Sequence, residues 1–280
     1  MTGSLYLVST PIGNLGDISK RALQKLSEVD FIASEDTRVT LKLLIRFNIK
    51  KQLISYHEYN RRESGLRIIN RILMGENCAL VTDAGTPGIS DPGEDLVILC
   101  IESGIPVIAI PGPCAAVTAL TLSGLPSGRF TFEGFLSTVK KSRFEHLNEL
   151  KTEKRTMIFY EAPHKLNRTL NDMLTVLGDR RVSISRELTK LYEETLRCSL
   201  SEAIAHYEQT TPRGEFVLIL EGAQNESLSE LDFTKAAAVV NNYVDEGFSL
   251  KDAVKKAAEE TGVPKNALYK ATIKQVISKK

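Results

Sequence analysis

The sequence is poor in cysteine, lacks tryptophan and has no long uninterrupted apolar run. Its four cysteines form neither a Cys-x-x-Cys pair nor a Cys/His set with metal-ligand spacing, so we expect no metal site and reduced thiols of a cytoplasmic protein. These are Cys78, Cys100, Cys114 and Cys198. The most apolar stretch, 96–122, is broken by Glu102 and several prolines and glycines, which excludes a membrane span there. The apolar run at 5–8 is too short for the core of a signal peptide.

The sequence also has no excess of positive or negative charge. With 36 Lys and Arg against 35 Asp and Glu, the formal net charge is +1. No long-range field therefore steers the whole molecule onto nucleic acid, although a local basic face is compatible with this balance. The hydrophobic share of 42% and charged share of 25% are those of a globular protein. A chain of 280 residues suggests two domains and an appendage.

Glycine and proline are concentrated in three loops, each of which directly follows a short apolar segment. The segments, predicted to be strands, are 5–8, 79–82 and 107–110, and the loops are 9–17, 83–93 and 111–113. Glycine permits close approach of the backbone to a ligand, and proline stiffens a turn. Because ligands bind at the carboxyl ends of strands in open α/β sheets, we expect one composite small-molecule pocket.

Strands alternate with amphipathic helices in the first 122 residues, which predicts a parallel or mostly parallel α/β sheet. The segment 123–128 holds two Gly, two Ser and one Pro and is the best linker candidate. A second α/β unit follows it. The predicted domains are 1–122, 123–225 and a helical domain at 229–280. Further strands are expected at 31–34, 130–136, 156–160, 182–185 and 216–220, and further helices at 18–29, 66–73, 96–103, 164–177 and 201–209.

The C-terminal part has helical spacing throughout. Ser249 to Asp252 is a capping box that opens a helix, and Gly262-Val-Pro264 turns the chain into a third helix ending at Lys280. This order resembles a helix-turn-helix. The last 17 residues hold five lysines and no acid, so they either touch phosphates or form a solvated face of a small bundle.

The glycine loops do not fit the common nucleotide motifs. Gly13 to Gly16 and Gly85 to Gly88 are GxxG only, and neither GxGxxG nor GxxxxGK[ST] occurs. A KH loop requires its GxxG between two helices, whereas these loops follow strands. The remaining interpretation is a ligand held mainly by backbone groups, such as a nucleoside without a polyphosphate.

Seven motifs, in order, resemble one family. They are Ser9-Thr-Pro-Ile-Gly-Asn-Leu-Gly-Asp-Ile-Ser19, Ser34-Glu-Asp-Thr-Arg38, Val81-Thr-Asp-Ala-Gly-Thr-Pro-Gly-Ile-Ser-Asp-Pro-Gly93, Ile110-Pro-Gly-Pro-Cys-Ala-Ala-Val-Thr-Ala-Leu120, Phe159-Tyr-Glu-Ala-Pro-His164, Ser185-Arg-Glu-Leu-Thr-Lys190 and Arg213-Gly-Glu-Phe-Val217. The family is ribosomal RNA small subunit methyltransferase I, a branch of the tetrapyrrole-methylase (class III) methyltransferases. The likeness spans about residues 4–222, and the helical tail resembles the family's helix-turn-helix-like domain.

The resemblance implies S-adenosyl-L-methionine (SAM) in a cleft between two α/β domains of tetrapyrrole-methylase type, and a homodimer. The implied reaction methylates the ribose 2′-oxygen of a cytidine in the decoding region of 16S rRNA. Because that region lies within folded RNA, we expect the assembled 30S ribosomal subunit to be the substrate. The residues carried over as cofactor-binding are Pro11, Gly13, Asp83, Gly85, Thr86, Pro87, Pro111, Gly112, Ala115 and Ala116; simple turn geometry is the alternative for the glycines and prolines.

A ribose hydroxyl reacts poorly while protonated, so a nearby base is useful, and no metal is required. The candidate catalytic residues are Glu35, Asp36, His57, Glu161, Glu187 and Lys190. Helix capping, a surface loop position and ion pairing within the chain are the competing interpretations. Arg38, Arg61, Arg62 and Arg186 are the candidate RNA-binding residues, with ordinary solvated charge as the alternative. Tyr59 departs from the family's Tyr-His-Glu segment, where His or Asn is more frequent.

Two other functions stay open at this point. One is a class III methyltransferase that acts on a tetrapyrrole or a protein side chain, which the form of the first loop and the lysine-bearing tail disfavour. The other is a SAM-binding or ribosome-binding module without catalysis, which the intact cleft motifs disfavour.

Overall fold

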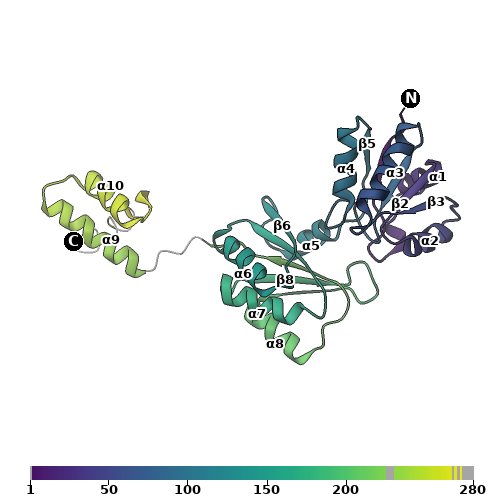
Figure 1. Cartoon of the computed structure of the whole chain (residues 1–280). Coiled ribbons are helices and arrows are strands. Elements are labelled where there is room, and N and C mark those ends of the chain that lie inside the picture. Colours follow the sequence, from purple (N-terminus) through teal and green to yellow (C-terminus); the bar gives the residue numbers. More distant parts are fainter. Residues whose placement is uncertain (1, 225–229, 267, 270–271, 273–280) are drawn as a thin grey trace. The chain divides into compact units, whose positions relative to one another are not determined.

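The computed structural model describes residues 2–224, 230–266, 268, 269 and 272, and the chain divides into two compact units, Met1–Ala223 and Gln224–Lys280. The first unit contains two five-stranded sheets, and the second is helical (Figure 1). The expected α/β class with a helical C-terminal part is confirmed.

The first sheet is parallel throughout, as predicted. Its strands lie in the order β3-β2-β4-β1-β5. Their bounds are β1 (Leu5–Val8), β2 (Phe31–Ser34), β3 (Gln52–Ser55), β4 (Cys78–Val81) and β5 (Val107–Ile110). The strand β3 was not predicted, because it lies at the edge and has only two apolar residues, Leu53 and Ile54, between Gln52 and Ser55.

Helices cover both faces of this sheet. One face holds α3 (Arg61–Leu73) and α4 (Gly93–Glu102), and the other holds α1 (Lys20–Glu28) and α2 (Thr37–Arg46). Along β2, Phe31 and Ala33 enter the first of these cores and Ile32 enters the second, as the two-residue period of a strand requires. Because all five strands are parallel, the loops that follow them emerge at the same end of the sheet, the carboxyl end. A short 3-10 helix, η1 (Leu15–Asp17), lies in the first of them.

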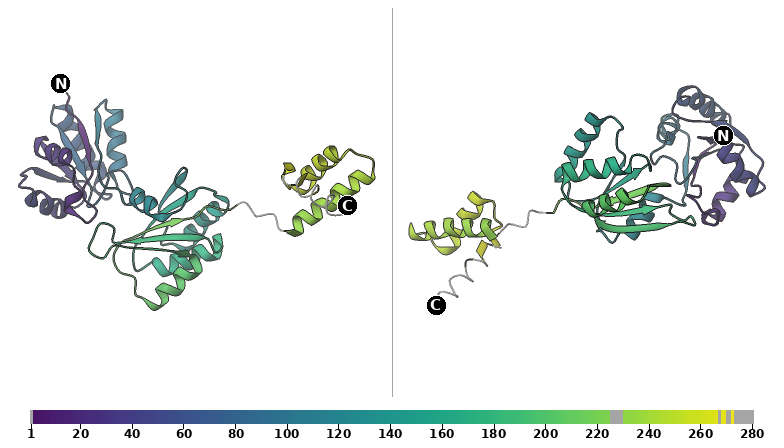
Figure 2. Two further views of the ribbon diagram at one scale, coloured as in Figure 1. Left: turned by 180° about the vertical axis from the view of Figure 1, so that it is seen from behind. Right: turned by 90° about the horizontal axis from the view of Figure 1, so that it is seen from below.

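The second sheet is mixed, with the order β6-β7-β10-β8-β9. Only β6 and β7 are parallel; the other pairs are antiparallel. The bounds are β6 (Phe130–Phe135), β7 (Thr156–Glu161), β8 (Arg181–Arg186), β9 (Glu194–Ser199) and β10 (Phe216–Leu220). One face is covered by α6 (Lys140–Glu149), α7 (Leu166–Leu177) and α8 (Leu200–Gln209), with η2 (Leu150–Thr152) after α6 (Figure 2). The half-exposed β9 and the weakly amphipathic α6 were not predicted.

The opposite face of this sheet is covered by α5 (Ala115–Ser123). Ala119 and Leu120 of this helix pack against Ile158 of β7 and Ile219 of β10. The helix follows the third Gly/Pro loop of the first sheet, so its first turn connects that loop to the second sheet. The predicted division at 123–128 lies after this helix, whereas the packing joins the helix to the second sheet.

The second unit contains α9 (Glu230–Asp245) and α10 (Leu250–Thr261). The predicted start of α10 is confirmed, because the Ser249 hydroxyl accepts a hydrogen bond from the Asp252 backbone N–H at 3.2 Å. Gly262 ends the helix with φ of 72°, a left-handed conformation that favours glycine. Most of the predicted third helix, including its end at Lys280, falls outside the described residues. Among the described residues, no helix is long and apolar enough to cross a membrane.

Candidate functional site

A cavity of about 450 Å³ opens at the carboxyl edge of the first sheet, inside the first unit. Loops after β1, β2 and β4 line one side of it, through residues such as Ile12, Glu35 and Asp83. The second sheet supplies the other side, which includes Tyr160 and Val217. This volume lies within the range of small-molecule sites in proteins, roughly 300–1,000 Å³.

The three Gly/Pro loops meet at one threonine. Thr86 donates its hydroxyl proton to the Pro113 carbonyl oxygen at 2.9 Å, and its Oγ1 lies 3.0 Å from Ser9 Oγ. Since the Thr86 proton is already used, Ser9 donates to Thr86. Thr10 and Gly85 add two backbone hydrogen bonds between the first and second loops. The predicted composite pocket is therefore built from loops that are bonded to one another.

The first loop also contacts the turn between β8 and β9. The Asn14 backbone N–H donates to Thr189 Oγ1 at 3.1 Å. Gly13 has φ of 157°, and a Cβ there would lie 2.4 Å from Lys190 Cγ. The turn itself contains Glu187 and Thr189 at φ of 52° and 67°, which is unusual for residues other than glycine. This strained turn brings Leu188 into the cavity wall.

Carboxylates gather on the side of the cavity formed by the first sheet. Glu35, Asp83 and Asp91 all line it. Burial raises the pKa of Glu35, and the negative charges of Asp83 and Asp91 raise it further. Burial also raises the pKa of Asp83, although the Asp36 backbone N–H donates to Asp83 Oδ1 at 3.1 Å. Asp91 accepts hydrogen bonds from the backbone N–H groups of Gly88 and Gly93, which fixes the loop after β4.

The predicted cofactor-binding residues fall into two groups. Four of them line the cavity, namely Asp83, Gly85, Thr86 and Ala115. The other six are not among its lining residues, namely Pro11, Gly13, Pro87, Pro111, Gly112 and Ala116. Several of these hold the lining in place: a Cβ on Gly112 would lie 2.9 Å from Ser9 Cβ, and Ala116 N–H donates to the Tyr160 hydroxyl at 3.2 Å.

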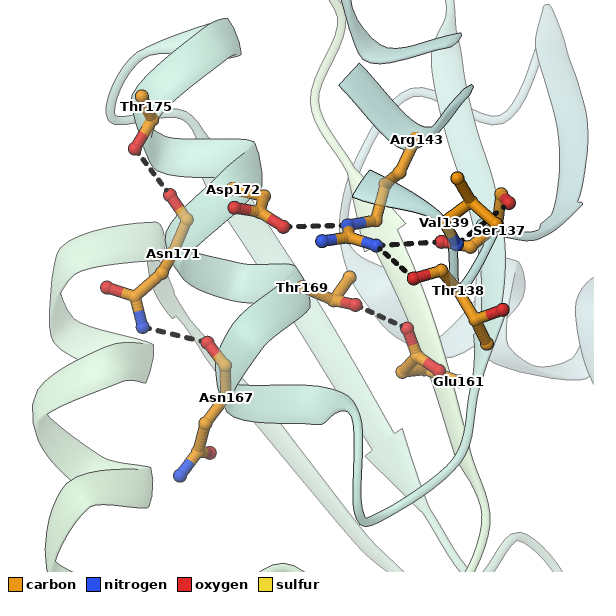
Figure 3. A network of polar contacts seen from close by, with 10 residues as sticks. All are labelled: Ser137, Thr138, Val139, Arg143, Glu161, Asn167, Thr169, Asn171, Asp172 and Thr175. Carbon is orange, nitrogen blue, oxygen red and sulfur yellow. Dashed lines mark hydrogen bonds and ion pairs between the residues drawn. The ribbon is translucent and has the colours of Figure 1, made fainter. Parts of the chain in front are cut away.

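Of the six candidate catalytic residues, only Glu35 and Glu161 line the cavity. Glu161 is 3% exposed, and its carboxylate accepts a hydrogen bond from Thr169 Oγ1 at 2.5 Å (Figure 3). It accepts another from the Ala162 N–H at 2.8 Å. Both carboxylate oxygens of Glu161 are thereby used within the protein, and the bond to Thr169 holds the first turn of α7.

The other four candidates do not line the cavity. Arg38 binds the carboxylate of Asp36 and lowers its pKa to about 2. Lys190 Nζ donates to both Glu187 and Glu215 at 2.8 Å, and these hydrogen bonds raise the pKa of Lys190 although its burial lowers it. His57 does not line the cavity, but its charge is close enough to oppose the raised pKa of Glu35.

The four candidate RNA-binding arginines lie outside the cavity. Arg38, Arg61 and Arg186 form ion pairs with Asp36, Asp95 and Glu194. Arg62 is exposed and has no hydrogen-bond or ion-pair partner among the described residues. Each arginine therefore keeps at least part of its donor set at the surface.

The sequence did not single out several side chains that line the cavity. Phe135, Tyr160 and Val217 come from three strands of the second sheet, and Cys114 precedes α5. Burial raises the pKa of the Tyr160 hydroxyl to about 12, so it stays protonated at neutral pH. The motifs at 159–164 and 213–217 marked these segments without indicating which side chains face the cavity. Among the described residues, no group of His, Cys, Asp and Glu is arranged to hold a metal ion.

Comparison with known proteins identifies the family. A model of the tetrapyrrole (corrin/porphyrin) methylases matches residues 4–204, and a model of the RsmI C-terminal HTH domain matches residues 244–275. A ribosomal RNA small subunit methyltransferase I from Halalkalibacterium halodurans is 51% identical over 95% of this chain and 93% of that protein. The chain belongs to the ribosomal RNA small subunit methyltransferase I family.

Other members of the methyltransferase I family match over nearly the same length. The protein of that name from Synechocystis is 46% identical over 97% of this chain, and the one from Escherichia coli O157:H7 is 46% identical over 98%. Among solved structures, a uroporphyrin-III C-methyltransferase from Thermus thermophilus has a TM-score of 0.56 at 17% identity, covering 78% of this chain and 97% of that one. A structure of that enzyme complexed with S-adenyl homocysteine has a TM-score of 0.55. These likenesses show the tetrapyrrole-methylase fold.

Proposed function

We propose that this protein transfers a methyl group from SAM to the ribose 2′-oxygen of a cytidine in the decoding region of 16S rRNA, the cytidine numbered 1402. The observation that carries the proposal is 51% identity to a ribosomal RNA small subunit methyltransferase I over nearly the whole of both chains. The cavity at the edge of the first sheet supplies a site of suitable size for the methyl donor.

The cavity fits SAM in its chemistry as well as its size. Asp83 offers a carboxylate for ribose hydroxyls or an ammonium group, and Ile12, Ala115 and Val217 offer apolar surface for a base. Gly85, which has φ of 89°, lines the cavity without a side chain, while its backbone N–H and C=O are both bonded to Thr10. When bound, SAM supplies a methyl group that is already activated by its sulfonium. The work left to the protein is to orient the acceptor and to remove its proton.

We assign the proton acceptor to Glu35. It lines the cavity, and only the Asp83 backbone N–H donates to its carboxylate among the described residues. Side chains, by contrast, already donate to Glu161 and Glu187, from Thr169 and Lys190 respectively. A raised pKa makes the Glu35 carboxylate a stronger base, which suits it to accept the proton of a ribose hydroxyl.

The remaining assignments concern the partners. We propose that Arg38, Arg61, Arg62 and Arg186 contact the phosphates of the RNA, that the assembled 30S subunit is the natural substrate, and that the protein works as a cytoplasmic homodimer. Arginine suits phosphate because its guanidinium presents several donors in a rigid plane.

The test is methyl transfer from tritium-labelled SAM to 30S subunits isolated from a strain that lacks the enzyme. Label at the 2′-oxygen of the expected cytidine supports the proposal. Label in a ribosomal protein, or in a tetrapyrrole precursor offered in parallel, would assign the protein to another branch of the class III methyltransferases. Protein that binds SAM but transfers no label to any of these would be a binding module. Naked 16S rRNA methylated as fast as 30S subunits would refute the assignment of the assembled particle.

A further inference from the structure

The turn that follows β3 presents a tyrosine with almost no contact to the protein. Tyr59 is 94% exposed, although the turn around it is well held. The Asn60 side chain accepts from the His57 backbone N–H at 2.8 Å and donates to the Ser55 carbonyl at 3.1 Å. A third hydrogen bond, from Asn60 N–H to the His57 carbonyl at 3.0 Å, closes the turn. The backbone under Tyr59 is therefore fixed while its ring is free, which lowers the entropic cost of binding a partner there.

The order of the strands places this turn next to the reaction site. Ser55 of β3 is in register with Ser34 of β2, and Ser34 is in register with Val81 of β4. The segments that follow these three neighbouring strands therefore lie side by side at the carboxyl end of the sheet. The turn with Tyr59 follows β3, Glu35 follows β2, and Asp83 follows β4. The loops proposed to hold the methyl donor follow β4, β1 and β5. A base that takes the acceptor's proton has to lie beside the acceptor, so the β3 side of Glu35 is where the acceptor nucleotide approaches.

His57 interacts with both Tyr59 and Glu35. Its ring lies edge-on to the ring of Tyr59, with centroids 6.1 Å apart and an angle of 65° between the planes. Its charge also acts on Glu35. His57 therefore contacts the Tyr59 ring and lies near enough to the proposed base for its charge to act there.

The charges around Tyr59 are nearly balanced. Arg61 is held by Asp95, with Nη1 and Oδ2 2.5 Å apart, whereas Arg62 is exposed and has no such partner among the described residues. Glu58 and Glu63 flank this pair in the sequence. The net charge around Tyr59 therefore attracts RNA phosphates only weakly. The exposed ring of Tyr59 is the stronger recognition element for RNA at this turn. Aromatic faces are used to hold unstacked bases in single-stranded RNA.

We propose that Tyr59 stacks on a nucleobase of the acceptor RNA next to the ribose that is methylated, with Arg62 against a neighbouring phosphate. This inference rests on the proposed function, because it takes the acceptor to be RNA.

The experiment compares Tyr59→Leu and Tyr59→Phe with a matched change, Met74→Ala. Met74 is 85% exposed and lies just beyond the other end of α3, a helix of 13 residues and thus roughly 20 Å long. Steady-state methylation of 30S subunits and calorimetric binding of SAM are measured for each. We expect Tyr59→Leu to raise the KM for 30S subunits about ten-fold or more, Tyr59→Phe to stay near the wild type, and Met74→Ala to change nothing. SAM affinity is expected to be unchanged in all three.

A second pair of variants tests Arg62. Arg62→Gln is expected to weaken 30S binding and to lower the slope of log affinity against log salt by about one, whereas Arg67→Gln, farther along the same helix, is not. A wild-type KM for Tyr59→Leu would overturn the proposal, as would a Tyr59→Leu protein that changes only its oligomeric mass in solution. Failure of the wild-type protein to methylate 30S subunits would instead overturn the proposed function.

Discussion

The hydroxyl oxygens of Ser9 and Thr86 lie 3.0 Å apart, although 77 residues separate them in the chain. Through this contact and the Thr86 bond to Pro113, one partly buried side-chain pair connects the loops after β1, β4 and β5. The cavity walls on this side depend on each other, because a shift of one loop has to break a hydrogen bond to the next.

Replacing Thr86 by Val is expected to destabilise the protein and weaken SAM binding. The change keeps the side-chain shape but leaves the Ser9 hydroxyl and the Pro113 carbonyl without their partner, which costs about 1–3 kcal/mol. Urea unfolding measures the first effect and calorimetry the second. Thr86→Ser retains the hydroxyl and is the control; an equally large loss in Thr86→Ser would show that the methyl group, rather than the hydrogen bonds, holds the loops.

Replacing Glu35 by Gln is expected to lower kcat about 10²–10⁴-fold with little change in SAM affinity, because the variant keeps the shape but removes the proposed proton acceptor. Single-turnover methylation of 30S subunits measures this effect. Glu161→Gln is the comparison, and its main expected effect is on stability, since its carboxylate holds Thr169. A kcat for Glu35→Gln within three-fold of the wild type would remove Glu35 from the reaction.

The same variant is expected to change the pH dependence of stability. The folded-state pKa of Glu35 is raised above its ordinary value of 4.5. The folded state thus binds this proton more tightly than the unfolded state, and the associated stability is lost as pH rises from about 4.5 through the raised pKa. Glu35→Gln removes that loss. At pH 7 the variant should therefore unfold at a higher urea concentration than the wild type, while below pH 4 the two should be similar.

Replacing Gly13 by Ala is expected to disturb both the first loop and the turn after β8. The added Cβ would lie 2.4 Å from Lys190 Cγ and 2.9 Å from Thr189 Oγ1, so one of the two segments has to move. Because Ile12 and Leu188 both line the cavity, SAM affinity should fall along with stability. Gly104→Ala is the control: Gly104 has φ of 67° but open space around it, so only the conformational cost of about 1–2 kcal/mol is expected, with normal SAM binding.

Replacing Arg143 by Ala is expected to cost about 3–5 kcal/mol of unfolding free energy. Arg143 is buried, with Nε 2.7 Å from Asp172 Oδ2, and it also donates to the carbonyls of Ser137 and Thr138 (Figure 3). Its loss leaves a largely buried carboxylate and releases the loop after β6. The exposed pair Lys141–Glu145 on the same helix is the control, and Lys141→Ala should cost less than about 1 kcal/mol. The double change Arg143→Met, Asp172→Leu should recover much of the loss.

Local patterns were sufficient for much of the first sheet and for the loops. β1, β2, β5 and β10 have the predicted bounds, since each is a short, largely apolar segment followed directly by a polar residue or proline. β3 and β9 were missed because their residues are of mixed polarity, whereas β5, which also lies at an edge, is entirely apolar and was found. The family motifs marked the segments of the cavity, but only about half of the residues chosen within the loops face it.

The sequence by itself determined the apolar strands, the places where glycine and proline follow them, and the family that the chain resembles, because these depend on residue identity and short-range geometry. The tertiary structure decided which loops meet. It brought Gly13 against Lys190, set Glu35 rather than Glu187 in the cavity wall, and packed α5 on the second sheet. Such contacts join residues far apart in the chain, and they depend on strand order and on the packing of whole faces, which no local pattern records.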